Sequence, residues 1–207
     1  LKREGDPASH SEWRDPEAAL AATAKLLRLA TAAGKRVHVL HVSTAAEMQL
    51  LALHKDVASV EVTPQHLTLA APEVYRRLGT KAQMNPPLRE AADVEAMLTG
   101  IVDGTVDAIA TDHAPHAADE KNVEFDRAPF GITGLETAVG LAFTRLQLPI
   151  GRMIDMFSLN PQQIMKVAPW GIFEGSPADL TVLDPARKWT FDVTKSRSKS
   201  RNSPFHG

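Results

Sequence analysis

The sequence predicts an α/β fold with a buried parallel sheet, on the strength of two observations. Three short apolar runs rich in β-branched residues, at 36–42, 58–63 and 106–111, are typical of strands covered on both faces. Segments whose apolar residues recur at helical spacing alternate with these runs. This alternation fits either a doubly wound sheet or part of a (β/α)8 barrel.

The first helix and strand are the clearest elements. A helix is predicted from Asp15 to about Ala33. Asp15 can cap its start, Pro16 suits the first helical position, and Gly34 suits its end. The strand at 36–42 follows almost directly, so a tight turn is expected between the two elements.

The next two units repeat this order. A helix is expected over 43–54, and the strand at 58–63 follows it. An amphipathic helix then runs from about Glu90 to Gly104 and leads into the strand at 106–111. Three successive units of this kind make the α/β prediction consistent along the first half of the chain.

Beyond the third strand the pattern changes. The polar segment 112–134 is long for a connection within a compact domain, which is uncommon unless the segment has a function. Helices are expected over 135–146 and 160–167, the second capped by Asn160. Residues 179–183 indicate a further strand outside the alternating series.

The composition is that of an ordinary globular protein and excludes several classes. The 207 residues carry a formal net charge of −2, so no overall positive field would hold nucleic acid or an anionic membrane. No apolar run is long enough to span a membrane, and the first residues lack the apolar core of a signal peptide. Without cysteine, any metal must bind through His and carboxylate groups. The Ser/Lys/Arg-rich stretch 195–207 is expected to be an exposed tail.

Polar side chains follow each predicted strand. His41, His66 and Asp112 fall at or just after the carboxyl ends of three successive strands. Parallel strands end at one edge of a sheet, and α/β folds bind their ligands at that edge. We therefore expect these three residues on one face, beside a candidate site.

The densest cluster of chemically active groups is the DHAPH sequence at 112–116. One carboxylate and two imidazoles follow a strand end there, and Pro115 stiffens the turn between the imidazoles. Such groups can bind zinc and can move protons near neutral pH. The alternative is a solvated loop in which Asp112 only caps a helix. The position after an apolar strand favours the functional interpretation.

His38 and His41 lie on the same predicted strand. Period-two alternation would place their side chains on opposite faces. His41 is nearer the strand end and is the better ligand candidate, whereas His38 is more simply explained as a packed or hydrogen-bonded histidine.

Two further loops could contact a substrate. In the NPPLR sequence, two prolines would hold the Asn85 amide and the Arg89 guanidinium at set positions. An amide can pair with a ureido or imide edge, and a guanidinium with a carboxylate. The alternative for Arg89 is an ion pair with surface carboxylates. At Phe130-Gly131, glycine would let the backbone approach a ligand closely, although this pair alone is also typical of a turn.

Taken in order, several segments resemble dihydroorotases of the amidohydrolase superfamily, specifically the bacterial single-function type. They are HVLHVST, VTPQHL, KAQMNPPLR, DGTVDAIATDHAPH, EK, APFGITGLETA, SLNPQQIM, GSPADLTVLDP and KSRNSPF. The resemblance extends from about Asp15 to the end of the chain, and TDHAPH together with NPPLR is its most specific part. It implies a (β/α)8 barrel with a small β-sandwich. On this basis residues 1–170 would be the C-terminal part of the barrel, and 171–207 part of the sandwich and a tail.

The resemblance also implies an activity and residue roles. Members reversibly cyclise N-carbamoyl-aspartate to dihydroorotate in pyrimidine synthesis, with two zinc ions in each active site. His41 would bind one zinc and Asp112 the other, with Asp112 also acting as general base and acid. Asn85 and His116 match substrate-contacting positions, and the backbone at 130–131 matches the segment that pairs with the ring.

Other family residues are unassigned or have no counterpart. His66 and Arg89 lie in family motifs without an assigned contact, so His66 is kept as a candidate for supporting the site indirectly. The family's His-x-His pair, bridging Asp or carboxylated Lys, and fifth-strand His are not found in this sequence. We therefore expect a C-terminal portion without the N-terminal barrel half, inactive by itself, whose open sheet edges make it fold poorly or associate.

Two alternatives stay open. One is a related cyclic-amide hydrolase, such as a hydantoinase or allantoinase, and the NPPLR and TDHAPH pair argues against it. The other is a non-catalytic dihydroorotase-like partner of aspartate transcarbamoylase, against which the retained His41, Asp112 and His116 argue. The expected partner is a small molecule, dihydroorotate or N-carbamoyl-aspartate, in the cytoplasm. Homodimerisation or association with aspartate transcarbamoylase are the protein partnerships that the resemblance allows.

Overall fold

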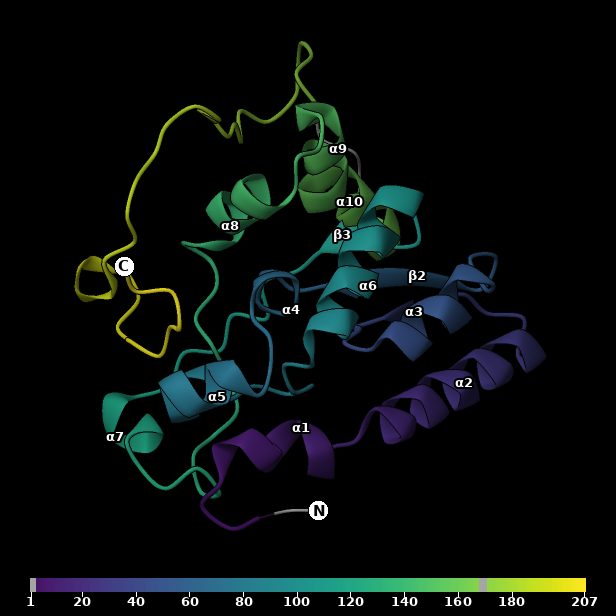
Figure 1. The fold of residues 1–207 in the computed structure, drawn as a ribbon. Coiled ribbons are helices and arrows are strands. Elements are labelled where there is room, and N and C mark those ends of the chain that lie inside the picture. Colours follow the sequence, from purple (N-terminus) through teal and green to yellow (C-terminus); the bar gives the residue numbers. More distant parts are fainter. Residues whose placement is uncertain (1–2, 168–170) are drawn as a thin grey trace.

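A computed structural model describes residues 3–167 and 171–207. At its centre lies a three-stranded parallel sheet in which strands adjacent in the sequence are also neighbours in space (Figure 1). The register places Val62 opposite Ile109. The strands are β1 (Val37–Val39), β2 (Ala58–Val62) and β3 (Ala108–Ile109). The α/β class with a parallel sheet is confirmed, and each strand is shorter than predicted.

Helices precede and follow each strand. They are α1 (His10–Trp13), α2 (Pro16–Ala32), α3 (Ala45–Ala52), α4 (Pro64–Thr68), α5 (Glu73–Leu78), α6 (Ala91–Asp103), α7 (Ala118–Lys121), α8 (Ala138–Arg145), α9 (Ile150–Ile154) and α10 (Asn160–Met165). Shorter helical turns are η1 (Pro7–Ser9), η2 (Gly79–Ala82), η3 (Asp155–Leu159), which has π-helical hydrogen bonds, and η4 (Val193–Lys195).

The predicted start and stop signals act as expected in the long helices. The Asp15 side chain accepts a hydrogen bond from Ala18 N at 2.6 Å and so caps α2. Thr44 caps α3 by accepting from Glu47 N at 3.1 Å. Gly104 ends α6 with a left-handed φ of 88°, a conformation that glycine adopts without steric cost.

Two clusters of buried apolar side chains hold these elements together. The first joins the sheet to α3, α6, α8 and η3, and the second lies under α5 and the loops that follow it. Among the fully buried members of the first are Leu51, Val60, Val62, Met97, Val106 and Met156. Among those of the second are Tyr75, Ala82, Met84, Leu88 and Ile132. The second cluster supports the loops on which several candidate site residues lie.

The C-terminal part departs most from the sequence prediction. Residues 179–183 form no strand, because a strand needs a hydrogen-bonded partner and none lies beside them among the described residues. Asn160 does not cap α10; η3 runs directly into that helix, and the Asn160 amide donates to Asp107 O at 2.8 Å instead. The domain boundary expected at residue 170 falls outside the described residues.

The predicted exposed tail is also wrong in part. Ser200, Asn202 and Ser203 are buried, and Asn202 O accepts a hydrogen bond from Thr133 N at 3.0 Å. The last residues of the chain, yellow in Figure 1, therefore return to the body of the protein. Their Ser and Asn side chains find polar partners there that a composition-based prediction does not reveal.

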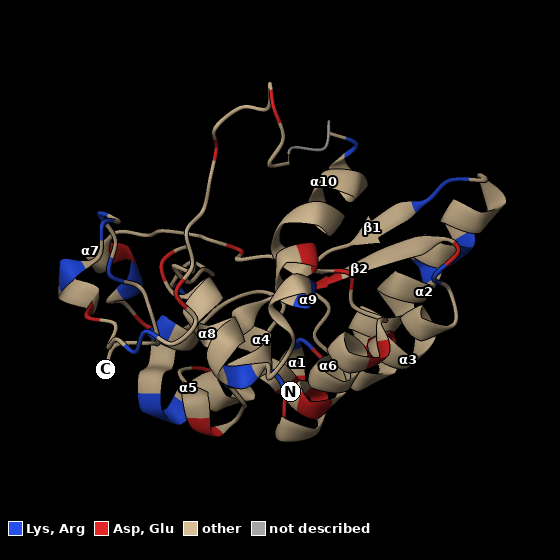
Figure 2. Ribbon diagram, turned by 90° about the horizontal axis from the view of Figure 1, so that it is seen from above, with Lys and Arg blue, Asp and Glu red and all other residues tan. Residues whose placement is uncertain are grey.

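The distribution of charge and of apolar residues agrees with the composition. Acidic and basic residues are interspersed along the ribbon rather than divided between two faces (Figure 2). Within the described part of the chain, no helix combines the length and apolar character needed to cross a bilayer.

Candidate active site

Glu61 joins the two histidines of the first strand region. Its Oε2 lies 2.9 Å from His38 Nε2, and its Oε1 lies 2.6 Å from His41 Nδ1. His38 Nδ1 is in turn 2.8 Å from Ser59 Oγ. Both histidines thus meet one buried carboxylate that projects from β2.

The prediction that His38 and His41 occupy opposite faces is therefore wrong. β1 ends at Val39, so strand alternation does not extend to His41. His41 has a left-handed φ of 51°, which turns its side chain to the same side as His38. The expectation that His38 makes a structural hydrogen bond agrees with its contacts to Glu61 and Ser59.

Asp112 has the same unusual backbone conformation, with a φ of 46°. Its Oδ1 lies 3.7 Å from His41 Nε2. The left-handed region costs an ordinary residue about 1–2 kcal/mol, and such strain is concentrated at functional sites. The residues that follow β1 and β3, the strands on either side of β2, thus bring a histidine and a carboxylate toward each other, both in a conformation that the fold must support.

The charge of Glu61 and the protonation of the two neighbouring histidines affect each other strongly. Burial alone would raise the pKa of Glu61, but the hydrogen bond with His38 and the close ion pair with His41 outweigh it and hold the Glu61 pKa at about 2. The Glu61 carboxylate in turn raises the pKa of His41. Glu61 is consequently a fixed negative charge behind the imidazole of His41.

The arrangement fits one side of a metal site. A histidine whose Nδ1 contacts a carboxylate has its orientation fixed and offers Nε2 to a metal, which is a common arrangement around bound zinc. His41 Nε2 faces Asp112 in this way. Zinc sites require three or more protein ligands, and no cluster of three such side chains is found in the described residues. His41 and Asp112 fit as part of a ligand set.

His116 is held by two other segments. Its Nε2 donates to Phe130 O at 2.9 Å, and its backbone N donates to Asn202 Oδ1 at 3.2 Å. Asn202 also donates from Nδ2 to Ala114 O at 2.8 Å and to Gly131 O at 3.1 Å. The predicted substrate-contacting residues His116, Phe130 and Gly131 are thus brought together.

The glycine at position 131 is required by its surroundings. Its φ is 151°, and a Cβ there would lie 2.7 Å from Ala114 Cβ and 2.8 Å from His116 Nε2. Its N donates to Gln83 O at 2.9 Å. The backbone polar groups of Gly131 are thus paired within the chain, and the Phe130 ring stacks on His10 with centroids 5.4 Å apart.

Lys121 is buried beneath the same loop. Its Nζ donates to Pro129 O at 2.8 Å and to Gln83 O and Gly131 O, both at 3.3 Å. Burial lowers the pKa of Lys121 to about 8. Lys121 therefore ties the loop that holds Gly131 to the segment that leads to Asn85.

Asn85 lies in the loop before α6, and His66, in α4, packs against that loop. The Asn85 side chain is exposed and has no hydrogen-bond partner within the described ranges, so its amide is available to a ligand. His66 is buried, with Nδ1 2.8 Å from Thr63 Oγ1 and Nε2 3.2 Å from Pro86 O. Its complete burial lowers the pKa of His66 to about 4, so it stays neutral while it supports the loop.

Arg89 has an internal role. Its side chain is buried, and Nη1 donates to Ser11 O at 3.0 Å and to the carbonyl oxygen of Arg14. Its Nε lies 3.4 Å from Ser43 Oγ, two residues beyond His41. Arg89 therefore satisfies carbonyls at the end of α1 and fixes that helix beside the site. Among the described residues Arg89 forms no ion pair with a surface carboxylate, and its predicted contact with a substrate carboxylate stays a prediction.

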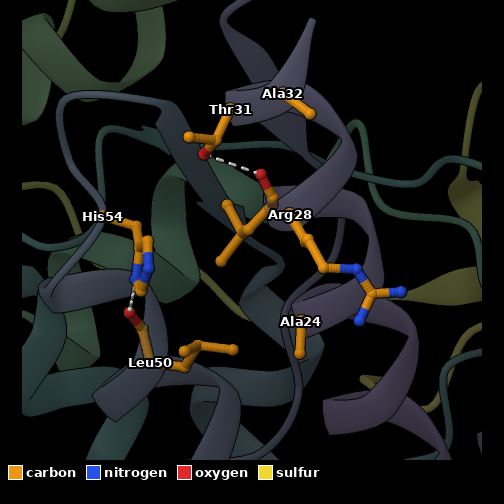
Figure 3. A pocket seen from close by; sticks show the side chains of 7 residues that line it. Ala24, Arg28, Thr31, Ala32, Leu50 and His54 are labelled. Atoms are coloured by element: carbon orange, nitrogen blue, oxygen red, sulfur yellow. Dashed lines mark hydrogen bonds between the residues drawn. The ribbon is translucent and has the colours of Figure 1, made fainter.

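Two cavities lie away from these residues. One of about 340 Å³ between α2 and α3 has an apolar lining, with Arg28 and His54 at its edge (Figure 3). The Arg28 side chain extends away from His54 there, and His54 Nδ1 is bound to Leu50 O at 2.8 Å. A second, of about 1130 Å³, lies between α8 and residues 182–191. Neither includes the histidines and carboxylates described above, so chemistry rather than cavity size identifies the site.

Sequence reasoning missed three residues. Glu61 stands in an otherwise apolar strand, and a charge in such a place is itself a signal of a buried partner. Lys121 belongs to a short EK pair that carries no signal by itself. Asn202 was hidden in a stretch whose composition is typical of a solvated tail.

The chain is similar in sequence to known bacterial proteins. It is 43% identical to the dihydroorotase of Geobacter sp. (strain M21) over 192 residues, covering 90% of this chain and 45% of that protein. It is also 43% identical to the dihydroorotase of Pelotomaculum thermopropionicum, with 89% and 44% covered. The chain thus spans less than half the length of the curated relatives that it matches. No protein-family model matches it.

The chain is also similar in fold to solved structures of a hydantoinase and a dihydropyrimidinase. The L-hydantoinase (dihydropyrimidinase) of Arthrobacter aurescens superposes with a TM-score of 0.84 at 26% identity, covering 91% of this chain and 44% of that one. The dihydropyrimidinase of Brevibacillus agri superposes with a TM-score of 0.86 at 24% identity, covering 98% and 47%. At that identity the second match shows the fold alone.

Proposed function

We propose that this chain, which is homologous to bacterial dihydroorotases along 90% of its length, supplies part of a dihydroorotase active site. The activity would be the reversible opening of the cyclic amide of dihydroorotate to N-carbamoyl-aspartate. The observation that carries the proposal is the convergence of His41 and Asp112, 3.7 Å apart, with Glu61 behind the histidine. This is the arrangement expected of metal-assisted hydrolysis.

Asp112 is proposed as the group that moves the proton. A carboxylate at this place can accept a proton from an attacking water and return it to the ring nitrogen as the amide bond breaks. His41 orients one side of the reaction centre, because its Nδ1 is held by Glu61. Zinc, when bound by His41 and Asp112 together with further ligands, would polarise the ring carbonyl and make water a stronger nucleophile at neutral pH.

Asn85, His116 and the backbone at 130–131 are proposed to bind the substrate. The free amide of Asn85 offers a donor and an acceptor to the ureido edge. His116 donates through Nε2 to Phe130 O, so its ring plane is fixed relative to the loop. Binding at 130–131 would exchange part of the internal hydrogen bonding of that loop for contacts with the ring.

The remaining ligands are proposed to come from the part of the dihydroorotase sequence that this chain does not match. Two zinc ions need more donors than His41 and Asp112 provide. The superposition with a hydantoinase supports the proposal that β1 to β3 belong to a (β/α)8 barrel and that residues 171–207 accompany its β-sandwich. Open edges at β1 and β3 would then be covered by neighbouring barrel strands.

The test is turnover by the protein as its gene encodes it, expressed without metal and then loaded with zinc. We expect dihydroorotate to be opened and N-carbamoyl-aspartate to be cyclised, with loss of both reactions on chelation. The 207-residue chain alone is expected to be inactive, and adding the unmatched part of the Geobacter relative should restore activity. Failure of the zinc-loaded protein to act on dihydroorotate in either direction contradicts the proposal.

A hydantoinase is the second candidate, favoured by the structural match to the Arthrobacter aurescens enzyme. The same metal-site residues would serve a five-membered ring. The higher identity to dihydroorotases, 43% against 26%, favours the first candidate. Comparing turnover of dihydroorotate, hydantoin and allantoin separates them, because turnover of hydantoin without dihydroorotate would select the second.

A further inference from the structure

Lys121 is a buried charged residue for which the reaction has no use. Its side chain is only 5% exposed. The Nζ atom meets three carbonyl oxygens, those of Gln83, Pro129 and Gly131, and within the described residues no carboxylate contacts it. Burying an ammonium group costs free energy unless its N–H donors form hydrogen bonds, and all three donors of Lys121 do so.

The three oxygens belong to two different segments. Pro129 and Gly131 flank Phe130, while Gln83 lies two residues before Asn85. Gln83 O also accepts from Gly131 N at 2.9 Å, so the two segments are joined directly as well as through Lys121. A single ammonium group therefore occupies the junction between the two loops assigned to substrate binding.

The junction cannot shift without moving His116. Phe130 O accepts from His116 Nε2 at 2.9 Å, and the α-carbon of Gly131 is packed against Ala114. Displacing the backbone at 129–131 by a fraction of an ångström would change this hydrogen bond. A change in the position of Lys121 would therefore move the Phe130 carbonyl and, with it, the hydrogen bond to His116.

We propose that Lys121 is a positioning residue for substrate binding, whose three hydrogen bonds set the spacing between the Asn85 loop and the backbone at 130–131. The inference rests on the proposed function, because it assigns these loops to the substrate. A purely structural lysine would stabilise the protein equally with or without substrate. A positioning lysine changes KM for the substrate.

Protonation of Lys121 is part of this arrangement. The ammonium form has three donors for three oxygens, whereas the neutral amine has two. Burial lowers the pKa of Lys121 to about 8, so the third donor is lost within an accessible pH range. Among the described residues, His10 from α1 interacts electrostatically with Lys121, and its pKa of about 4 keeps it neutral throughout that range. Of these two groups, Lys121 is the one that changes protonation state between pH 7 and 9.

The kinetic experiment uses the zinc-loaded protein as its gene encodes it, with Lys121→Met and the control Lys25→Met on the exposed face of α2. We expect Lys121→Met to raise KM for dihydroorotate roughly 10- to 100-fold, as for substrate-binding groups displaced by up to about 1 Å. Zinc content should stay unchanged and kcat should change less than KM. In the unsubstituted protein KM should rise between pH 7 and 9, and in Lys121→Met it should not. An unchanged KM, or a loss confined to kcat, overturns the proposal.

Hydrogen exchange separates this inference from the proposed function. The Gly131 amide should exchange at least tenfold faster in Lys121→Met than in Lys25→Met, without substrate present. In the unsubstituted protein its protection should fall between pH 7 and 9, a measurement that needs no variant to fold. Unchanged protection in both comparisons overturns the role of Lys121. Altered protection with no turnover of dihydroorotate by any form rejects the proposed function instead.

Discussion

His41 and Glu61 meet through Nδ1 and Oε1, 2.6 Å apart, and this contact determines which nitrogen of His41 remains for a ligand. The free nitrogen, Nε2, faces Asp112. Because Glu61 also holds His38, one carboxylate fixes the end of β1 to β2. Substitutions at this contact and in the loops around it should change zinc binding, turnover or stability in the protein as its gene encodes it.

Glu61→Gln should weaken zinc binding. The amide keeps the shape of the side chain but removes the negative charge behind His41, so the imidazole becomes a poorer ligand. Loss of such a carboxylate partner typically costs about 10- to 100-fold in metal affinity. Competition with a chromogenic chelator measures the change. Glu95→Gln, which removes only the exposed partner of Arg145, is the matched control. Equal zinc affinity in the two variants would show that Glu61 does not tune the site.

Asp112→Asn should abolish turnover while preserving the fold. Asparagine tolerates the left-handed φ of 46° found at this position, so little backbone strain is added. The proton acceptor is lost, for which a decrease in kcat of about 10²- to 10⁴-fold is expected. Steady-state kinetics and a thermal melt check the two statements. An Asp112→Asn variant with near-normal kcat would remove Asp112 from the proton transfer.

Gly131→Ala should destabilise the protein and reduce activity together. The new methyl group would lie 2.7 Å from Ala114 Cβ and 2.8 Å from His116 Nε2, at a φ of 151°. Overpacking of this kind costs about 1–3 kcal/mol in the free energy of unfolding. Gly151→Ala is the control, because no atom lies within 4 Å of the place that its methyl group would take in α9. Denaturant unfolding that gives equal stability for both variants would contradict the crowding at Gly131.

His10→Phe should reduce the sensitivity of the fold to acid. His10 is fully buried among aromatic rings, and burial lowers its pKa from 6.5 to about 4. His10 therefore binds a proton more readily in the unfolded chain than in the folded protein. Its protonation does not affect the free energy of unfolding above pH 6.5, and it lowers that free energy as the pH falls toward 4. The loss due to His10 approaches about 3 kcal/mol at pH 4.

The measurement is the free energy of unfolding as a function of pH, with the exposed His206→Phe as control. His66 has a similarly lowered pKa, so the slope in His10→Phe should decrease rather than disappear. Because neither ring nitrogen of His10 has a partner in the described residues, phenylalanine should not cost a hydrogen bond at pH 7. If the free energy of unfolding falls with pH as steeply in His10→Phe as in His206→Phe, the buried His10 does not have the lowered pKa.

Asn202→Ala should loosen the loop that contains Gly131. The Asn202 amide donates to Ala114 O and Gly131 O, and its Oδ1 accepts from His116 N. Leaving these buried groups unpaired costs about 1–3 kcal/mol. Asn122→Ala, at an exposed position, is the control. Unfolding curves that coincide for the two variants would show that water replaces Asn202 without cost.

The sequence was sufficient for the order of α2, β1, α3, β2, α6 and β3, but not for the short helices α1, α4 and α5. Helical periodicity, the Asp15 and Thr44 caps and the Gly104 stop are local signals, and local signals determine where α2, α3 and α6 begin or end. Strand length was less predictable, because it depends on hydrogen bonding to a neighbour. Residues 179–183 show the limit: β-branched residues alone do not form a strand where no partner lies beside them in the described part of the chain.

The candidate site was predictable in its residue types but not in its contacts. His41 and Asp112 stood out because they follow apolar strands, and the structure brings them to 3.7 Å. Their left-handed backbone could not be read from the residues, since His and Asp adopt it only where the surroundings stabilise it. The internal role of Arg89 was equally hidden, because its partners are carbonyl oxygens of a helix 75 and 78 residues away in the sequence.

Asn202 has a consequence for the order in which the protein is made. Its partners Ala114 and Gly131 precede it by 88 and 71 residues. During synthesis the sheet, α3 and α6 can form before residue 202 has left the ribosome. The loop around Gly131 lacks its hydrogen bonds to Asn202 until then. Contacts between such distant residues form slowly because a long loop must close first. The sheet can therefore form during synthesis before the loop around Gly131 gains its hydrogen bonds to Asn202.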